Sequence, residues 1–226
     1  MPVFNGIEYL DKSIRSILVQ SYEDFEFVII DDASTEPVWE LLNSYSDKRL
    51  VLYRNTTNIG LTKSLNRYLP VLHGDFIARH DGDDIALPER FHEELAAFVP
   101  QIGLVSCWAK AINQDGAFLP SPWEDQIARV NSEEVIDKLA TTSCIVAPGA
   151  IFRKEVVQKI GYFDEELKMA QDYNYWLRLL PFFNIHIIEK VLVWKRSWPG
   201  TVWNSPQTID WIALARERAM QFPIVN

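Results

Sequence analysis

Three carboxylates, Asp81, Asp83 and Asp84, directly follow the short apolar run 76–78. The run predicts a buried strand, and its continuation would place Asp81 and Asp83 on one face, because side chains of a strand repeat every second residue. Neighbouring carboxylates repel each other unless a positive charge lies between them, and Mg²⁺ is typically held by one or two carboxylates together with substrate phosphates. The cluster therefore predicts a site for a divalent cation and a phosphorylated ligand, with a solvated turn as the alternative interpretation.

A second acidic pair, Asp31 and Asp32, follows the apolar run 25–30, and a further acid, Asp172, lies in an aromatic stretch. Strand and helix patterns alternate to about residue 105, which predicts a mainly parallel sheet with helices on both faces. Ligands bind beyond the carboxyl ends of such strands, so we expect one pocket to collect the acids Asp31, Asp32, Asp81 and Asp83. Helix capping by the first pair and a first-turn helix position for Asp172 are interpretations that involve no ligand.

Length and charge limit the classes of protein to which the chain can belong. Its 226 residues suit one domain, its 48% hydrophobic content is enough for a sizeable core, and its net charge is −9. This acidic balance argues against nucleic-acid binding, and no apolar run reaches the roughly 18 residues that a membrane span needs. Cys107 and Cys144 lie in separate apolar stretches and are expected to be small buried residues.

Hydrophobic periodicity predicts the elements that must position these acids. In the first half we expect strands at 25–30, 50–53 and 76–78 and helices at 7–18, 38–45, 61–69 and 88–98. In the less regular second half we expect a strand at 102–111, two short strands within 185–194, and helices at 156–160, 172–180 and 208–220.

Taken together and in their order, several short segments resemble the nucleotide-sugar glycosyltransferases of glycosyltransferase family 2. The resemblance covers most of the chain, from Pro2 to about Trp194, and depends on Pro-Val-Phe-Asn-Gly at 2–6, Gln-Ser-Tyr-Glu-Asp-Phe-Glu at 20–26, Ile-Asp-Asp-Ala-Ser at 30–34, Asn-Ile-Gly-Leu at 58–61, Asp-Gly-Asp at 81–83, Gly-Tyr-Phe-Asp at 161–164 and Gln-Asp-Tyr-Asn-Tyr-Trp-Leu-Arg at 171–178. It implies an α/β fold of the GT-A (Rossmann-like) type, with a mainly parallel central sheet flanked by helices and a smaller acceptor-side lobe. The single domain, 1–226, would then comprise a nucleotide-sugar-binding half, 1–105, and an acceptor-binding half, 106–226.

The resemblance also implies roles for individual residues. Asp83 would coordinate Mn²⁺ or Mg²⁺ at the two phosphates of the donor, and Asp81 would support the donor ribose or the metal shell. Asp32 would accept a hydrogen bond from the base, most often uracil, and Asp172 would be the catalytic base. The other residues expected to bind the nucleotide are Pro2, Val3, Phe4, Asp31 and Lys63.

The implied reaction is the inverting transfer of a sugar from a nucleotide-sugar, with a UDP-sugar expected, to a saccharide or lipid-linked saccharide acceptor. A carboxylate on the acceptor side would take the hydroxyl proton, and the metal would neutralise charge on the leaving diphosphate. The aromatic neighbours of Asp172 would tune its pKa upward by desolvation. By family analogy the enzyme would be cytoplasmic, with peripheral association at the inner face of the membrane, and would build surface polysaccharide or glycolipid.

The chain departs from the family pattern at three points. Relatives usually carry several apolar residues ahead of the segment that matches Pro2. Either the true start therefore lies upstream, or the central strand is shortened and leaves backbone groups of its neighbours unpaired. Many relatives have Glu-Asp where this chain has Gln171-Asp172, and many have a His near the position of Ala147. These departures bear on the activity of the chain and on its acceptor.

Two other functions remain open from the sequence. The Asp-Gly-Asp at 81–83 also resembles the Asp-x-Asp of haloacid-dehalogenase phosphatases, so a Mg²⁺-dependent phosphotransfer enzyme is one alternative, although Arg79 and His80 interrupt the apolar strand expected there. The shortened first strand favours another alternative, a catalytically degenerate domain that binds nucleotides as a scaffold. Lys195 and Arg196 follow the last predicted strand and are expected to form a solvated pair.

Overall fold

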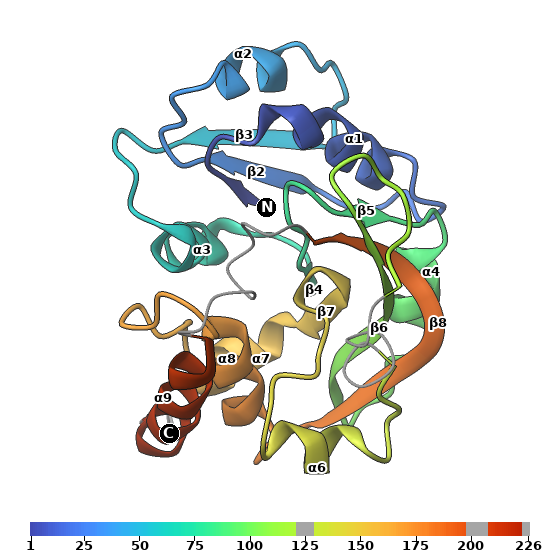
Figure 1. The fold of residues 1–226 in the computed structure, drawn as a ribbon, viewed down its shortest axis with the longest axis vertical. Coiled ribbons are helices and arrows are strands. Elements are labelled where there is room, and N and C mark those ends of the chain that lie inside the picture. Colours follow the sequence, from blue (N-terminus) through green and yellow to red (C-terminus); the bar gives the residue numbers. More distant parts are fainter. Residues whose placement is uncertain (121–128, 198–207, 223–226) are drawn as a thin grey trace.

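The computed structural model describes residues 1–120, 129–197 and 208–222, and its strands form two sheets (Figure 1). The first sheet has the order β1 (Pro2–Val3), β2 (Phe27–Asp31), β3 (Leu50–Arg54). The second has the order β4 (Phe76–Ala78), β7 (Ala150–Arg153), β6 (Ile102–Ile112), β8 (Asn184–Arg196), β5 (Ile85–Ala86). The helices are α1 (Ile7–Leu18), α2 (Val38–Asn43), α3 (Leu61–Tyr68), α4 (Arg90–Ala96), α6 (Val135–Leu139), α7 (Lys154–Ile160), α8 (Gln171–Leu179) and α9 (Thr208–Gln221), with the short 3₁₀ helices η1 (Leu69–Val71) and η2 (Ala147–Gly149).

The first sheet is parallel, and helices cover both of its faces. β2 pairs in parallel with β1 on one side and with β3 on the other. Val28 and Ile30 pack with Tyr68 of α3, whereas Phe27 and Ile29 pack in the cluster that contains α1 and α2. Because successive side chains of a strand point to opposite faces, this alternation fixes the sheet between two apolar layers. The predicted parallel sheet with flanking helices is confirmed.

The second sheet is mixed, since β6 and β8 pair in parallel and the other pairs are antiparallel. Here the prediction of two short strands within 185–194 is wrong, because β8 runs through 13 residues. Glu189 and Lys190 interrupt the apolar pattern, but they are exposed at a register shift in the pairing with β6. A β-bulge thus accommodates the charged pair within one continuous strand.

Aromatic residues of α8 form the centre of the core beneath the second sheet. Tyr173, Tyr175 and Trp176 are completely buried, and the Phe152 ring of β7 lies 5.7 Å from the Tyr175 ring. Asn174 Nδ2 donates to the Ala215 carbonyl of α9 at 2.9 Å, which attaches the last helix to this core. The face of α8 that makes the core also fixes the start of the helix, where Asp172 lies.

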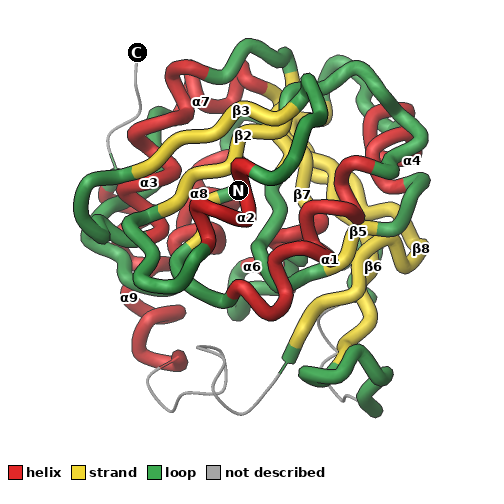
Figure 2. The backbone as a smooth tube through the Cα atoms, turned by 90° about the horizontal axis from the view of Figure 1, so that it is seen from above, coloured by secondary structure: helices red, strands yellow, loops and turns green. Residues whose placement is uncertain are grey.

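Figure 2, seen from above, shows β2 and β3 side by side and the strands β5, β6 and β8 gathered at another side of the molecule. In Figure 1 the N-terminus lies between the strands of the first sheet and β4 of the second. Cys107 and Cys144 are buried free thiols, as predicted. Among the described residues, no helix is both long enough and apolar enough to span a bilayer.

Candidate functional site

Helix α1 holds the loop between β4 and β5, residues 79–84. We call this segment the acid loop, because it carries Asp81, Asp83 and Asp84. Ser13 Oγ donates to the Asp81 carbonyl at 2.9 Å, close to the start of the loop. Gln20 Nε2 donates to the Leu87 carbonyl at 2.7 Å, just beyond β5. Ser13 on the buried face of α1 and Gln20 just after the helix therefore anchor the acid loop on both sides.

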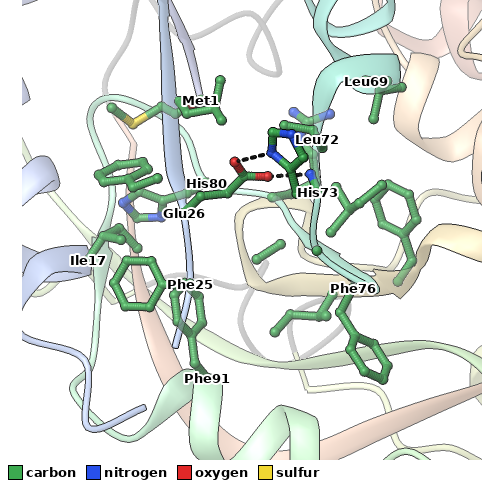
Figure 3. Close-up of a pocket in the computed structure, with 18 of the residues that line it drawn as sticks. Met1, Ile17, Phe25, Glu26, Leu69, Leu72, His73, Phe76, His80 and Phe91 are labelled. Atoms are coloured by element: carbon green, nitrogen blue, oxygen red, sulfur yellow. Dashed lines mark hydrogen bonds and ion pairs between the residues drawn. The ribbon is translucent and has the colours of Figure 1, made fainter. Parts of the chain in front are cut away.

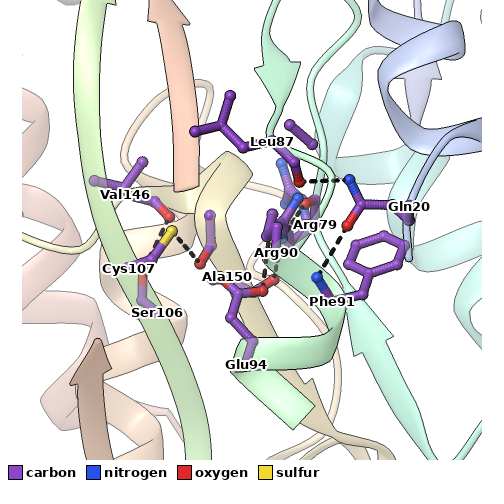
Figure 4. Close-up of polar contacts among 12 residues, drawn as sticks. Gln20, Arg79, Leu87, Arg90, Phe91, Glu94, Ser106, Cys107, Val146 and Ala150 are labelled. Carbon is purple, nitrogen blue, oxygen red and sulfur yellow. Dashed lines mark hydrogen bonds and ion pairs between the residues drawn. The ribbon is translucent and has the colours of Figure 1, made fainter. Parts of the chain in front are cut away.

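Arg90 of α4 holds the same loop from another direction (Figure 4). Its guanidinium is completely buried, donates through Nη2 to the Arg79 carbonyl at 3.0 Å, and pairs through Nε with Glu94 at 3.1 Å. Burial raises the pKa of Glu94 to about 7, and the charge of Arg90 works against this shift. A buried ion pair of this kind is costly to break by removing one partner, so it supports the strand end firmly.

The three acids of the loop have different surroundings. Asp84 is buried, and its Oδ1 accepts the backbone N–H of Arg196 at 2.7 Å, which makes it a structural residue. Asp81 and Asp83 are half-buried, and Asp81 Oδ1 lies 3.4 Å from Nη2 of Arg79. Of the three carboxylates, Asp81 and Asp83 are therefore the two that are accessible to a ligand.

Opposite pKa shifts distinguish these two carboxylates. Burial, followed by the negative charge of Asp81, raises the pKa of Asp83. Burial also acts to raise the pKa of Asp81, but the positive charges of Arg79 and Lys195 outweigh it, so the pKa of Asp81 is lowered. Asp81 is thus ionised more readily than Asp83, and its negative charge disfavours ionisation of Asp83. A bound cation would relieve this repulsion.

Arg196 at the end of β8 is buried and clamps the acid loop. Its Nε donates to the Asp83 carbonyl at 2.9 Å and its Nη1 donates to the Asn113 carbonyl at 2.6 Å. The expected solvated pair is therefore wrong for Arg196, because its guanidinium satisfies backbone carbonyls of two loops. Lys195 contributes positive charge to Asp81, Asp83 and Asp172.

The upstream acids, Asp31 and Asp32, are buried at the end of β2. Asp32 accepts hydrogen bonds at both oxygens, from Asn55 Nδ2 at 2.7 Å and from the backbone N–H groups of Ile59 and Gly60 at 3.0 and 2.8 Å. Asp31 accepts the Ser34 N–H at 2.8 Å and pairs with Arg54 Nε at 3.0 Å. Both carboxylates thus stabilise the loops that border the first sheet. Asp32 accepts three hydrogen bonds, and since a carboxylate has roughly four acceptor positions, about one remains for a ligand.

The end of β1 connects the two acidic regions. The Asp32 N–H donates to the Val3 carbonyl at 2.8 Å, and a Cβ placed on Gly82 would lie 3.0 Å from Val3 Cγ1. Val3 is buried, Pro2 is half-buried and Phe4 is exposed. Lys63 is exposed in the first turn of α3, three residues after Gly60, which donates to Asp32. A side chain at position 82 would therefore require Val3 to shift by a few tenths of an ångström.

Asp172 lies in the first turn of α8 and is buried. Its Oδ1 accepts the N–H of Tyr173 at 2.8 Å. Burial raises its pKa, against the positive charge of Arg79 and Lys195, and the negative charge of Asp81 adds to the rise. Asp172 and Asp81 of the acid loop therefore interact electrostatically with each other, and the positive charges of Arg79 and Lys195 act on both.

Sequence reasoning did not single out Arg79 as a site residue. It is 4% exposed, and its Nε and Nη1 have no hydrogen-bond partner among the residues described. Its guanidinium carbon lies 5.7 Å from the centre of the Phe163 ring. An arginine directly after an apolar strand pattern and just ahead of two acids is the sequence signal that would have revealed it, since Arg is rarely buried without a partner.

Left-handed backbone occurs beside three of the candidate site segments. In the part of the chain that the structure covers, the non-glycine residues with positive φ are Asn5, Ala33 and Ala170, at 58°, 60° and 56°. They adjoin Phe4, Asp32 and the Gln171-Asp172 start of α8. Such strain is costly for residues with a Cβ and is found preferentially at functional sites.

The described side chains do not form a complete metal cage. Within 1–120, 129–197 and 208–222, no group of three or more His, Cys, Asp or Glu could by itself hold a metal ion. Asp81 and Asp83 nevertheless fit a hard cation, because two half-buried carboxylates with coupled charge supply the oxygen ligands that Mg²⁺ and Mn²⁺ prefer. Phosphate oxygens of a ligand would complete such a site.

Comparison with known proteins settles the family. The sequence profile described as Glycosyl transferase family 2 matches residues 1–161 of this chain. The chain belongs to glycosyltransferase family 2. This transferase is 31% identical over 189 residues to the O-antigen biosynthesis glycosyltransferase WbnJ of Escherichia coli, covering 80% of this chain and 70% of WbnJ.

Solved structures share the fold of the transferase. S. aureus TarS 1–349 in complex with UDP has a TM-score of 0.69 and 23% identity, covering 98% of this chain and 67% of the TarS chain. The mannosyltransferase PcManGT of Pyrobaculum calidifontis, in complex with GDP-Man and Mn²⁺, has a TM-score of 0.75 and 18% identity, covering all of this chain and 64% of the other. The transferase spans roughly two thirds of the length of these proteins. The predicted GT-A fold is confirmed.

Proposed function

We propose that this family 2 transferase moves a sugar from a nucleotide-sugar, with a UDP-sugar favoured, to a saccharide or glycolipid acceptor, with inversion and with a divalent metal. The observation that carries the proposal is that the positive charge of Lys195 acts on Asp81, Asp83 and Asp172 alike, and that the charge of Asp81 acts on both other acids. Inverting sugar transfer needs a metal ion at the leaving diphosphate and, on the opposite side of the sugar, a group that accepts the proton of the acceptor hydroxyl.

Asp83 and Asp81 are proposed to hold Mn²⁺ or Mg²⁺ together with the two phosphates of the donor. The bound ion would supply positive charge for the leaving diphosphate. The clamps on the loop prepare it for this role, since Arg196 fixes the Asp83 carbonyl and Ser13 fixes the Asp81 carbonyl. Preorganised ligands of this kind lose little conformational entropy when the donor binds.

Asp172 is proposed to be the base that accepts the acceptor hydroxyl proton. Its buried position raises its pKa above that of a free carboxyl group, which makes its ionised form a better proton acceptor. The hydrogen bond from the Tyr173 N–H holds one of its oxygens and leaves the other available. Gln171 beside it is neutral, so the charge on the acceptor side comes from Asp172.

The donor base and ribose are proposed to lie over the end of the first sheet. Asp32, with its remaining acceptor position, faces the base, with Asp31 and Lys63 nearby and with Pro2, Val3 and Phe4 along the nucleotide. Phe4 is the exposed aromatic residue in this set, and a flat amphipathic base would cover it. UDP in complexes of a protein with this fold supports a UDP-sugar, whereas GDP-Man in another keeps the choice of base open to test.

The acceptor class follows from the relatives. WbnJ is described as an O-antigen biosynthesis glycosyltransferase, which supports surface polysaccharide assembly as the process served. We propose a cytoplasmic enzyme that meets a saccharide or lipid-linked saccharide acceptor at the inner face of the membrane.

Asp172→Asn separates donor binding from transfer. We expect the variant to bind UDP with Mn²⁺ within about twofold of the wild type but to lose at least about 100-fold in the transfer rate, because general-base catalysis contributes roughly 10²–10⁴-fold. Calorimetry measures the binding, and sugar transfer to an acceptor panel measures the rate. Gln171→Glu, which retains the acid, is the matched control and should keep activity. Full transfer by the Asn variant would refute the base assignment, and UDP binding without transfer by the wild type would favour the scaffold alternative.

A further inference from the structure

Residues 161–170 connect α7 to α8 and include the Gly-Tyr-Phe-Asp run at 161–164, to which the proposed reaction assigns no role. We call residues 161–170 the α8 entry segment, because Asp172 follows them in the first turn of α8. The segment ends at Ala170, which precedes the helix in left-handed backbone with a φ of 56°. The entry segment therefore decides how the chain enters the turn that carries Asp172.

Helix α3 holds the entry segment by pairing a side chain with its backbone. The Phe163 N–H donates to Asn66 Oδ1 at 2.9 Å, and Asn66 Nδ2 donates to the Phe163 carbonyl at 2.8 Å. The same Nδ2 lies 3.0 Å from Glu165 Oε1. One turn earlier on the same face of α3, Thr62 Oγ1 donates to the Leu167 carbonyl at 3.3 Å. A side-chain amide offers a donor and an acceptor together, so Asn66 satisfies both backbone groups of Phe163.

The Phe163 ring connects this attachment to the surroundings of Asp172. It stacks on the Tyr175 ring of α8, with the ring centres 4.2 Å and the ring planes 24° apart. Tyr175 comes three residues after Asp172, so both lie on one side of the helix. The guanidinium of Arg79, whose positive charge acts on Asp172, lies 5.7 Å from the centre of the Phe163 ring. Phe163 is thus in contact both with α8 and with a cation that acts on its acid.

The entry segment is also bound to α8 itself. Tyr175 Oη donates to the Gly161 carbonyl at 3.0 Å, and Arg178 Nη1 donates to the Tyr162 carbonyl at 2.8 Å. Segment and helix thus form one unit, which Asn66 attaches to α3.

Packing alone does not fix the Phe163 ring. Phe163 and Arg79 line a cavity of about 540 Å³, which Leu69 and Leu72 border from the segment after α3 (Figure 3). Because a cavity supplies no contact atoms on that side, the position of Phe163 depends more strongly on its backbone hydrogen bonds and on the Tyr175 stack.

The other face of α3 is attached to the upstream acids. Ser64 Oγ accepts a hydrogen bond from Asn55 Nδ2 at 2.9 Å, and the same Nδ2 donates to Asp32 at 2.7 Å. The N–H of Gly60, just before the helix, donates to Asp32 at 2.8 Å. Residues two apart on a helix do not share a face, so Ser64 and Asn66 point to different partners. One short helix therefore contacts both the proposed nucleobase site and the entry segment.

We propose that Asn66 is a positioning residue for sugar transfer, which holds Asp172 in place through Phe163. The inference rests on the proposed role of Asp172 as the base. Proton transfer to a base requires close alignment with the attacking hydroxyl, and a displacement of about 1 Å can lower a rate about 100-fold. Donor binding does not require this alignment, because Asp32 is held by a separate set of hydrogen bonds. Loss of the Asn66 amide should therefore affect kcat and spare the donor.

Substitutions on the two faces of α3 test this assignment. Asn66→Ala leaves both backbone groups of Phe163 without the amide, so kcat should fall at least about tenfold. The KM for the nucleotide-sugar and the affinity for UDP with Mn²⁺ should stay within about twofold. Ser64→Ala should instead weaken UDP binding about threefold and retain kcat at saturating donor. Asn43→Ala, at an exposed amide that donates to the Trp39 carbonyl of α2, is the matched control and should change neither quantity.

Amide hydrogen exchange shows whether the attachment is lost, and exchange at Phe163 should be at least about tenfold faster in Asn66→Ala. If that variant does not fold, Asn66→Asp retains the acceptor for the Phe163 N–H but removes the donor to its carbonyl, and kcat should fall at least about threefold at an unchanged donor KM.

Three results would overturn the proposal: unchanged exchange at Phe163, faster exchange with kcat within about twofold of the wild type, or equal losses in kcat and in UDP affinity. Failure of the proposed function is distinguishable from these results, because the wild type would then transfer no sugar or Asp172→Asn would remain active.

Discussion

The two acidic pairs of this transferase follow the same sequence pattern, an apolar strand and then neighbouring carboxylates, but their surroundings differ. Asp31 and Asp32 are buried and are held by donors of their own chain, including Arg54 and Asn55. Asp81 and Asp83 are half-buried, and the charge of Asp81 acts to raise the pKa of Asp83. Asp31 and Asp32 form hydrogen bonds and an ion pair within the chain and mainly stabilise the fold. The repulsion between Asp81 and Asp83 instead favours binding of a cation.

The largest expected difference is in metal-dependent donor binding. Asp83→Asn should lower the affinity for UDP in the presence of Mn²⁺ by at least about tenfold, because the ion loses a charged oxygen ligand. Isothermal titration with Mn²⁺ and with EDTA measures the effect. In the variant the two titrations should coincide, and retention of the full Mn²⁺ enhancement would contradict the role of Asp83.

The same substitution in the two pairs should have opposite effects on stability. Asp32→Asn places an amide among the N–H groups of Ile59 and Gly60 and the side chain of Asn55, so it should lower the free energy of unfolding by about 2–3 kcal/mol. Asp83→Asn removes charge repulsion in the ligand-free protein and should be neutral or stabilising. Denaturant unfolding of both variants without metal tests this contrast. Equal destabilisation would remove the distinction between the pairs.

A pH profile tests the electrostatic link between the acid loop and Asp172. A base must be ionised to act, and burial raises the pKa of Asp172, so transfer should fail on the acid side at a higher pH than for a free aspartate. Arg79 opposes that rise, so Arg79→Gln should move the acid limb of the kcat profile to still higher pH. Lys48→Gln, at an exposed lysine ahead of β3 and outside the proposed site, is the control. If the acid limb of the kcat profile did not move in Arg79→Gln, Arg79 would have no electrostatic influence on Asp172.

The smallest expected effect concerns backbone strain at the upstream pair. Ala33 adopts a φ of 60°, a conformation that a residue with a Cβ adopts at a cost of about 1–2 kcal/mol. Ala33→Gly should therefore raise the free energy of unfolding by up to about 1 kcal/mol after the entropy of glycine is included. Thermal unfolding measures the change. A loss of stability would contradict the strain assigned to this turn.

Local periodicity predicted the elements of the first half well, because their apolar residues face two covered sides. The helix predicted at 7–18 and the strand at 76–78 have these bounds in the structure. The strand β5, at Ile85–Ala86, was not predicted, since it is only two residues long and depends on pairing with β8, more than 100 residues away. The prediction of two strands within 185–194 was wrong for a related reason, because the bulge that keeps β8 continuous depends on its pairing with β6.

The candidate site shows the same limit. The sequence indicated which acids to consider, and the structure distinguishes Asp84, held by the Arg196 backbone, from Asp83, which is not. Long-range clamps such as Arg90 on the Arg79 carbonyl give no local signal, because a helical arginine has the same pattern whether it is solvated or buried. Roles that depend on partners distant in the chain therefore required coordinates.

The most direct test of the account is a crystal structure of the transferase with UDP and Mn²⁺, with the metal located by its anomalous scattering. The account predicts one peak in coordination contact with the Asp83 carboxylate and the diphosphate, with Asp81 beside it and Asp172 facing the same space. A peak at Asp31 and Asp32, or a UDP complex without metal at the acid loop, would contradict it.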